Sequence, residues 1–353
     1  MTVPRLEKYN KWTLWKSLAW FFTLCVIAPV ATLIALAATG NFEHWQNLLN
    51  YVIPQATLNT LILLAGVAIV VGLLGAGSAW LTSAFDFPSR KILMWALLLP
   101  LAVPTYIMAF AYLDLMHPLG PIQSIIRDIL GYTSPRQFRL PDVRSMPGAI
   151  LILGFALYPY VYLSTRVMFM TQSANLVEAA RTLGCTPTQA FHRVIVPMAR
   201  PAIVIGISLA LLETLNDIGA SEFLGIQTLT VSIYTTWVSR SNLAGAAQIA
   251  IFMLLIVTFI IYIERISRQR RRYSNTQRLR PIQPQKLQGK AALIAIILGW
   301  IPVLIGFIFP ALYLIVETVV RLEQVGTISS GLMHSTFNTL ILAACATAVT
   351  VMI

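Results

Sequence analysis

The chain carries, between two long apolar runs, the polar stretch Glu178-Ala179-Ala180-Arg181-Thr182-Leu183-Gly184, followed after nine residues by Val194-Ile195-Val196-Pro197. Alanine, arginine and leucine favour a helix, and Gly184 suits the left-handed position just past a helix end. Thr186 and Gln189 have the spacing of a capping box that opens a second helix, with Pro187 at its first position. We therefore predict two short helices with a stop at Gly184, a shape suited to docking on a partner.

The composition around this stretch is that of an integral membrane protein. The chain is 57% hydrophobic and only 11% charged, whereas soluble domains carry about 25% charged residues. The formal net charge of +12 does not indicate nucleic-acid binding, because the basic residues form short clusters beside apolar spans. The three cysteines (Cys25, Cys185 and Cys345) are far apart and lack metal-ligand spacing. Neither a disulfide framework nor a metal site is expected.

Apolar runs of about 20 residues predict transmembrane helices. We expect an all-α polytopic helical bundle with spans at about 18–38, 57–81, 92–113, 149–170, 202–218, 244–263 and 292–319, and an eighth span beginning near Thr336. The motif Ala35-Leu36-Ala37 leaves a cleaved signal peptide as an alternative for the first span. A span is preferred because the apolar run exceeds the roughly 7–15 residues of a signal-peptide core.

Lysine and arginine predict the orientation of these spans. The basic clusters include Lys8 before the first span, Arg90 after the second, Arg193 before the fifth and Arg265–Arg272 after the sixth. All of them belong to one side, which the positive-inside rule makes cytoplasmic. The 114–148 loop on the other side balances its arginines with aspartates. We expect a cytoplasmic N-terminus and a cytoplasmic Glu178–Gly184 stretch.

The chain repeats part of itself. Thr57-Leu58-Asn59-Thr60-Leu61-Ile62-Leu63 returns as Thr336-Phe337-Asn338-Thr339-Leu340-Ile341-Leu342, with one difference. This predicts a first repeat at 1–264 with a polar loop at 172–198, a basic linker at 265–290, and the start of a second, parallel repeat at 291–353. Two equal halves would need roughly 550 residues. The sequence thus predicts either a fragment of a longer protein or a split gene.

The polar loop resembles the coupling motif of importer-type ABC transporter permeases. That motif reads Glu-Ala-Ala, three residues, Gly, nine residues, then Ile-x-Leu-Pro, and this chain keeps its spacing with Val194 and Val196 as mild substitutions. The resemblance implies that the loop docks on an ATPase subunit and transmits its motion. It assigns the coupling contact to Glu178, Ala179, Ala180, Gly184 and Pro197. An ordinary capped hairpin is the alternative, but it does not account for the fixed distance to Pro197.

A second segment resembles the ferric-iron branch of these permeases, which is built as two fused halves. The resemblance rests on Asn216–Gly225, Gln227-Thr228 and Tyr234–Trp237. Glu213, Asp217 and Glu222 lie at or near the end of the fifth span, and acids at membrane depth usually face a cavity or a partner. They are candidates for a pathway that attracts a cationic cargo. The alternatives are that they cap helices, pair with Arg240 or contact a binding protein.

The sequence therefore predicts a membrane permease of an ATP-driven importer for ferric iron, in a bacterial cytoplasmic membrane. Its expected partners are a pair of identical ATPase subunits, which bind ATP and Mg²⁺, an extracytoplasmic binding protein and the lipid bilayer. No cofactor, catalytic set or nucleic-acid partner is expected of the chain itself. Thiamine, phosphonate or polyamine importers are alternatives, as is a secondary transporter or channel without an ATPase. Ala68, Gly72 and Ala76 form a small-residue ridge predicted to serve close helix packing.

Overall fold

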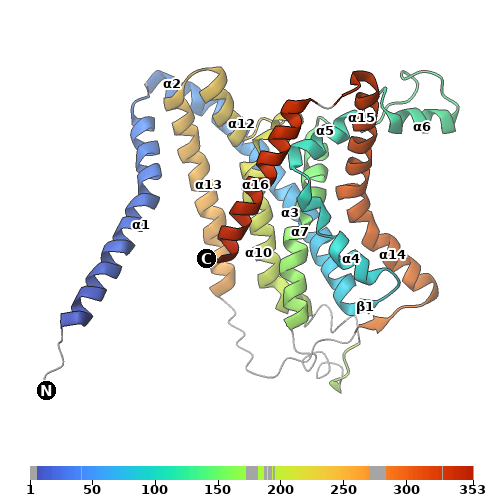
Figure 1. Ribbon diagram of the computed structural model, residues 1–353, viewed down its shortest axis with the longest axis horizontal. Helices are drawn as coiled ribbons and strands as arrows, with labels where there is room; N and C mark the ends of the chain where they lie inside the picture. The colour runs from blue at the N-terminus through green and yellow to red at the C-terminus, as the bar shows by residue number, and fades with distance from the viewer. Residues whose placement is uncertain are drawn as a thin grey trace. The chain divides into compact units, whose positions relative to one another are not determined.

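The structure is a computed structural model that describes residues 6–40, 42–171, 182–186, 189, 193, 195–269, 284–327 and 329–352. The chain divides into two compact units, Met1–Phe307 and Ile308–Ile353. Almost all regular structure is helical (Figure 1). The helices of the first unit are α1 (Leu6–Ala38), α2 (Phe42–Asn47), α3 (Ile53–Ala84), α4 (Arg90–Ala96), α5 (Thr105–Leu115), α6 (Pro121–Leu130), α7 (Met146–Thr171), α10 (Val196–Asn216), α11 (Ile218–Phe223), α12 (Leu229–Tyr234), α13 (Leu243–Gln269) and α14 (Gly289–Val303).

The polytopic architecture expected from hydropathy is confirmed. In the described part of the chain, seven helices are long and apolar enough to cross a membrane, or eight if one bent pair counts as a span. They are Trp15–Ala38, Trp45–Ala84, Met146–Met170, Val196–Asn216, Leu243–Ile263, Gly289–Val325 and Ser330–Met352. The division into two repeats stays a prediction.

The third span was predicted as one continuous helix, and this is wrong. Residues 90–102 and 105–115 are bent by 93° at a break between them. Pro104 begins the second piece, and Val103 before it is extended, with φ −103° and ψ 119°. A proline offers no backbone N–H and disfavours helical geometry in the residue before it. The chain therefore bends sharply here, which makes this segment either a broken span or a re-entrant loop.

The fifth span ends close to its predicted end at about residue 218. Helix α10 stops at Asn216, and Asp217 is extended, with φ −80° and ψ 92°. Its carboxylate then caps the short helix α11. Asp217 is therefore a junction between two helices and does not lie within the span.

The core of the first unit lies where α3, α7 and α10 pack together. Tyr158 and Tyr162 of α7 are fully buried, and 56% of the apolar window of α7 is buried, against none of that of α1. Glycines allow the helices to approach closely. A β-carbon at Gly75 would lie 2.5 Å from Cβ of Val161, and one at Gly206 would lie 2.5 Å from Cα of the same residue. Of the predicted ridge of Ala68, Gly72 and Ala76, Gly72 faces α10, where a β-carbon would lie 3.4 Å from Cδ1 of Ile207.

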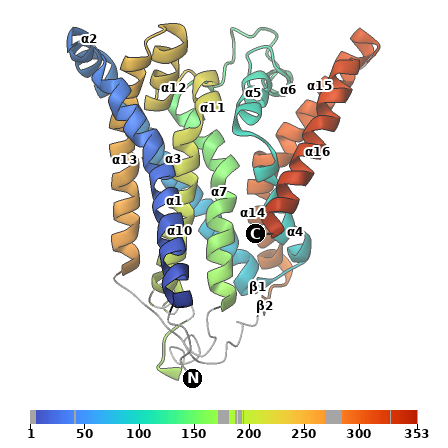
Figure 2. The ribbon, with the colours of Figure 1, turned by 60° about the vertical axis from the view of Figure 1, so that its left-hand side comes forward.

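The loops of the first unit gather at two ends (Figure 2). We call the Gly184 end the one formed by the last residues of α3, α7 and α13 and the first of α10. We call the α6 end the one formed by α2, α5, α6, α11 and α12. At the Gly184 end, two-residue strands β1 (Phe85–Asp86) and β2 (Gln285–Lys286) pair in parallel. The predicted linker thus returns to the end of α3 before α14 begins.

The second unit contains α15 (Phe309–Val325) and α16 (Ser330–Met352). Helix α15 ends at Gly326, whose φ of +77° is the left-handed geometry that favours glycine after a helix. Helix α16 holds the second copy of the repeated motif and has no buried residue. There Asn338 contacts Nδ1 of His334 in its own helix, at 3.1 Å from Nδ2, and its side chain makes no other hydrogen bond among the described residues.

Candidate functional site

The predicted coupling stretch is described only in part. Glu178, Ala179 and Ala180 lie outside the described residues. Gly184 is described, with φ +88°, and a β-carbon there would meet nothing within 4 Å. This is the left-handed stop expected after a helix. Among the described residues, no atom would contact a β-carbon at Gly184.

The capping box predicted after Gly184 is present. The backbone N–H of Gln189 donates to Oγ1 of Thr186 at 3.3 Å, and the N–H of Thr186 donates to Oε1 of Gln189 at 3.1 Å. These two bonds satisfy donors that a helix start leaves free. The loop therefore has a fixed turn immediately after its glycine.

Pro197 connects this loop to the membrane core. It stands in the first turn of α10, two residues after the buried Ile195 that precedes the helix. Proline is favoured there because the first helical N–H groups have no intrahelical partner. Helix α10 packs closely on α7 at Gly206.

Glu213 lies near the other end of α10 and is exposed. Leu209, one turn earlier, is 46% exposed, so the two residues share an uncovered side of the helix. Tyr160 of α7 is near enough to Glu213 to interact with it electrostatically. No basic side chain in the described part lies within 4.0 Å of this carboxylate.

Asp217 has two distinct carboxylate oxygens. Oδ1 accepts the N–H of Ala220 at 2.8 Å and so caps α11. Oδ2 is buried and has no hydrogen-bond partner among the described residues, and the buried hydroxyl of Ser221 is in the same state. Buried polar atoms are normally hydrogen-bonded. The capping alternative is therefore correct for one oxygen, while the other has capacity to bind.

Glu222 is exposed near the end of α11, and like the other two acids it has no ion-pair partner in the described part. The predicted alternative of pairing with Arg240 is absent there. The three acids thus follow α10 and α11 toward the α6 end. Among the described residues, no three His, Cys, Asp or Glu side chains gather as a metal site.

The first copy of the repeated motif is hydrogen-bonded to the turn between α11 and α12, which follows these acids. Asn59 donates from Nδ2 to the carbonyl of Gln227 at 3.1 Å. The hydroxyl of Thr60 accepts the N–H of Leu229 at 3.0 Å and donates to the carbonyl of Ala56 at 2.7 Å. Sequence comparison found the repeat but not its task, since a contact across 168 residues leaves no local signal. The Asn-Thr pair of α3 fixes the turn between α11 and α12.

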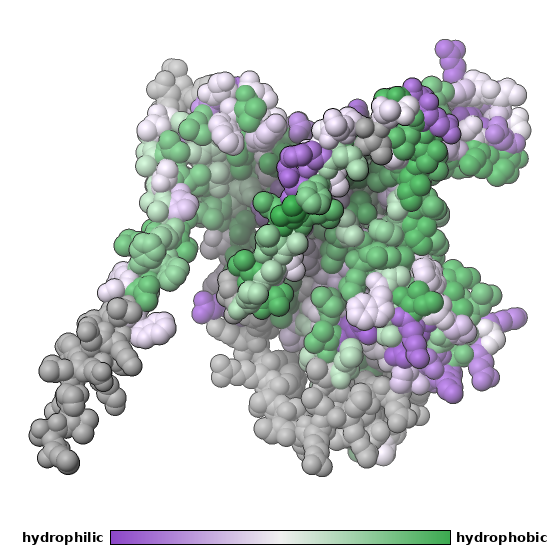
Figure 3. Space-filling view, in the orientation of Figure 1, coloured by the Kyte–Doolittle hydropathy of each residue, from purple (hydrophilic) through white to green (hydrophobic). Residues whose placement is uncertain are grey.

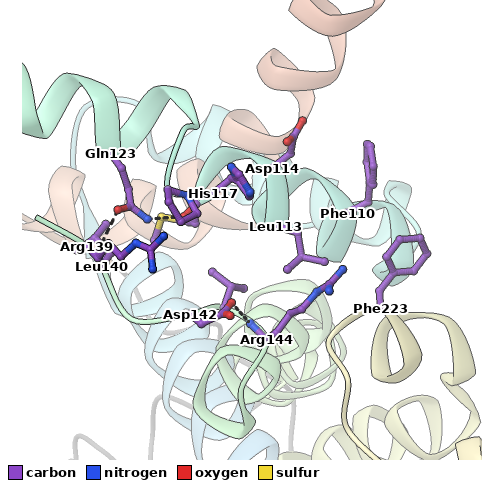
Figure 4. Close-up of a pocket in the computed structure, with 13 residues that line it drawn as sticks. Phe110, Leu113, Asp114, His117, Gln123, Arg139, Leu140, Asp142, Arg144 and Phe223 are labelled. Carbon is purple, nitrogen blue, oxygen red and sulfur yellow. Dashed lines mark hydrogen bonds between the residues drawn. The ribbon is translucent and has the colours of Figure 1, made fainter. Parts of the chain in front are cut away.

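A pocket of about 590 Å³ opens at the α6 end (Figure 4). Its lining mixes polar and apolar side chains, most of them from the 114–148 loop, with Phe110 and Leu113 of α5 and Phe223 of α11 completing it. Arg139, Leu140 and Gln123 lie on one side, and Arg144 extends from another side toward Leu113 and Phe223 (Figure 4). The sequence showed these residues as a charge-balanced loop and gave no sign that they surround a cavity.

The charges of this pocket are mixed. Arg139, Arg144 and His117 face it together with Asp114 and Asp142. Asp142 accepts the backbone N–H of Arg144 at 2.9 Å, so part of its acceptor capacity serves the loop itself. A polar ligand with acceptor groups fits this set of donors better than an apolar one does.

Comparison with known proteins gives a family. A family profile described as "Binding-protein-dependent transport system inner membrane component" matches residues 68–273. The chain is 25% identical over 205 residues to the sulfate transport system permease protein CysT of Salmonella typhimurium, covering 58% of this chain and 71% of that protein. It is 28% identical over 202 residues to the molybdenum transport system permease protein ModB of Escherichia coli, covering 54% and 85%.

The fold has a solved counterpart. A chain of a bacterial alginate ABC transporter, crystallised with its alginate pentasaccharide-bound periplasmic protein, superposes with a TM-score of 0.61. The sequence identity is 18%, and the match covers 75% of this chain and 98% of that one. At this identity the likeness shows a common fold.

Proposed function

The chain belongs to the family of binding-protein-dependent transport system inner membrane components and is a permease subunit of an ABC importer, and we propose that its cargo is ferric iron. The family assignment favours an ATP-driven importer over the secondary transporter or channel considered from hydropathy alone. The observation that carries the cargo proposal is that Glu213, Asp217 and Glu222 follow one another along α10 and α11 without an ion-pair partner among the described residues.

The Gly184 end is the cytoplasmic end in this proposal. Arg90, Arg193, Arg200 and Arg265 belong to segments at that end, and cytoplasmic loops carry an excess of lysine and arginine. The α6 end is then extracytoplasmic, where a binding protein would deliver cargo. The same orientation places the N-terminus in the cytoplasm.

The loop around Gly184 is the proposed contact with a pair of identical ATPase subunits. Those subunits bind ATP and Mg²⁺, and the permease contributes a rigid shape. Gly184 leaves an open surface, the Thr186–Gln189 capping box fixes the next turn, and Pro197 begins a helix that reaches the acids. Glu178, Ala179 and Ala180 complete the contact. Closure of the ATPase pair then shifts α10, and this shift links ATP binding to cargo access.

The cargo argument starts from the cost of an acid within an apolar span. Ionisable residues at membrane depth normally face a water-filled path or another polar partner. Glu213 is exposed on α10 and unpaired in the described part, and Asp217 has a buried oxygen without a partner. Carboxylate oxygens attract hard cations and repel oxyanions. A row of such groups supports a cationic cargo.

An oxyanion is the second candidate cargo. It is favoured by the arginines of the pocket at the α6 end and by the relatives, whose names describe sulfate and molybdenum transport. Arg139 and Arg144 supply forked donors of the kind that bind planar or tetrahedral oxyanions. The two candidates therefore place the cargo on different residues, so one experiment can separate them.

The experiment is ATP-driven uptake by the assembled transporter, with its ATPase and binding protein, in sealed vesicles. Radioactive ferric ion, sulfate and molybdate are offered separately. The proposal predicts uptake of ferric ion alone, and a loss of that uptake in Glu213→Gln. Asp128→Asn removes an exposed acid from α6 and is the matched control, with uptake unchanged. Uptake of sulfate or molybdate, with dependence on Arg139 and not on Glu213, would overturn the ferric proposal and support the second candidate.

A further inference from the structure

Helix α6 is an amphipathic helix whose apolar face, and not its polar face, is directed away from the rest of the protein. Its polar residues Gln123 and Arg127 are buried, with exposures of 1% and 6%. Its apolar residues are turned outward, and Ile125 and Ile129 are 57% and 78% exposed. Ile122 and Ile126 complete the same face, since positions three and four apart share one side of a helix. The helix therefore presents a row of isoleucines in which Ile125 and Ile129 are exposed and Ile122 and Ile126 are half-buried.

The polar side of α6 fixes this orientation. Gln123 donates from Nε2 to the carbonyl of Met116 at 2.6 Å and accepts the N–H of Leu140 at 3.1 Å. Arg127 donates to the carbonyl of Pro118 at 2.7 Å. Each bond ties the helix to backbone on one side only. Turning the isoleucines inward would leave these buried polar groups unsatisfied, which is costly.

The uncovered face is larger than the helix alone. Leu119 before α6 is 72% exposed, Leu130 at its end is 54% exposed, and Tyr132 just beyond is 41% exposed. Contiguous exposed apolar surface of this kind marks a contact with a protein or a membrane. Tyrosine is typical of the boundary between lipid and water.

The direction of the face decides between these two contacts. Helix α6 lies across the direction of α3 and α7 (Figure 1). In the space-filling view, the apolar side of the α6 region faces the level of the spans, and polar residues cover its opposite side (Figure 3). A soluble protein arriving from outside the membrane meets that polar side first. The apolar side instead faces the level at which the spans of the first unit run (Figure 3).

We propose that α6 is an interfacial helix that lies in the lipid leaflet at the α6 end, with Ile122, Ile125, Ile126 and Ile129 in the acyl-chain boundary. Such helices bind by apolar area, aided by electrostatic attraction where the lipid is anionic. The basic residue of α6, Arg127, donates to the protein's own backbone. Binding of α6 to the membrane therefore does not require anionic lipid. Gln123 of α6 is hydrogen-bonded to Leu140 in the pocket wall. The position of α6 in the lipid therefore also fixes how deep this wall lies.

A fluorescence experiment tests this contact in the intact chain. Cys25, Cys185 and Cys345 are replaced by serine, and a bimane label is attached to Ile129→Cys or, as the matched control, to Asp128→Cys on the same turn. The protein is placed in zwitterionic vesicles whose acyl chains carry bromine near the headgroup. We expect the label at 129 to lose fluorescence to brominated lipid and to resist aqueous iodide, and the label at 128 to show the reverse.

Two results would overturn the proposal. Equal quenching of both labels by iodide, with none by brominated lipid, would show that α6 does not touch the bilayer. Protection of the label at 129 that appears only when the purified binding protein is added would assign the face to that protein. Neither result bears on the cargo, which the uptake experiment tests on other residues.

Discussion

Gly75 of α3 offers the sharpest test of how the central helices pack. A β-carbon at this position would lie 2.5 Å from Cβ of Val161 and 2.8 Å from the carbonyl oxygen of Tyr158 and the backbone nitrogen of Tyr162. Two of these three atoms are backbone atoms, so a change of rotamer cannot relieve the contact. Gly75→Ala therefore requires α3 and α7 to separate locally. Overpacking of this kind costs about 1–3 kcal/mol.

Gly77→Ala is the matched control for this substitution. It lies two residues further along the same helix, and a β-carbon there would meet nothing within 4 Å. Both substitutions gain the same helix-propensity term of about 0.5–1 kcal/mol. That term cancels when the variants are compared, so their difference in unfolding free energy is the packing cost alone.

The assay is equilibrium unfolding of the two purified variants in mixed micelles with increasing denaturing detergent. We expect Gly75→Ala to unfold with about 1–3 kcal/mol less free energy than Gly77→Ala. Equal stability of the two variants would refute the close α3–α7 contact, and with it the core on which the loop and the acids are mounted.

Two further predictions concern the α6 end. Thr60→Val removes the acceptor of the Leu229 N–H at constant shape and should lower the unfolding free energy by about 1–3 kcal/mol, whereas Thr60→Ser keeps the hydroxyl and should lower it less. A spin label on Gln227→Cys should become more mobile in the Thr60→Val variant only, and equal mobility in both variants would argue against the bond. Arg127→Met removes the donor to Pro118 and should speed proteolysis of the 116–144 segment in intact protein, while Arg136→Met, a change at an exposed arginine, should not.

Local chemistry was the part of this molecule that the sequence could predict. The Thr186–Gln189 capping box and the left-handed Gly184 follow from rules about neighbouring residues, and both are present. Long apolar runs likewise predict spans, because the thickness of the bilayer fixes their length.

Features that depend on tertiary packing were not predictable in the same way. The ridge of Ala68, Gly72 and Ala76 has ideal spacing, yet it is Gly75 that lies against the backbone of α7. Small size permits a close contact, but the identity of the facing helix decides which glycine uses it. Pro100 and Pro104 indicate the break in the third span. Hydropathy averaged over a window does not register them, so the span was predicted as one helix.

The site shows the same limit. Glu213, Asp217 and Glu222 were found because acids are rare in apolar runs. The pocket of Arg139 and Arg144 was not found, because its walls come from the 114–148 loop and from Phe223 of α11, far apart in sequence. The role of Asn59 and Thr60 was hidden for the same reason.

The central claim is that the Gly184 loop transmits the work of the ATPase. Aspartate is one of the few residues that adopt the left-handed geometry, and no atom of the described chain lies within 4 Å of a β-carbon at Gly184. Gly184→Asp therefore leaves the loop folded and changes only the surface offered to a partner. Gly131→Asp makes the same change at the α6 end, where φ is +74° and the space is equally open.

The most direct measurement is ATP-driven cargo uptake by the assembled transporter in sealed vesicles, carrying either variant, with membrane insertion checked in parallel. The account predicts normal insertion of both, uptake abolished by Gly184→Asp, and uptake retained by Gly131→Asp. Normal uptake by Gly184→Asp would contradict it.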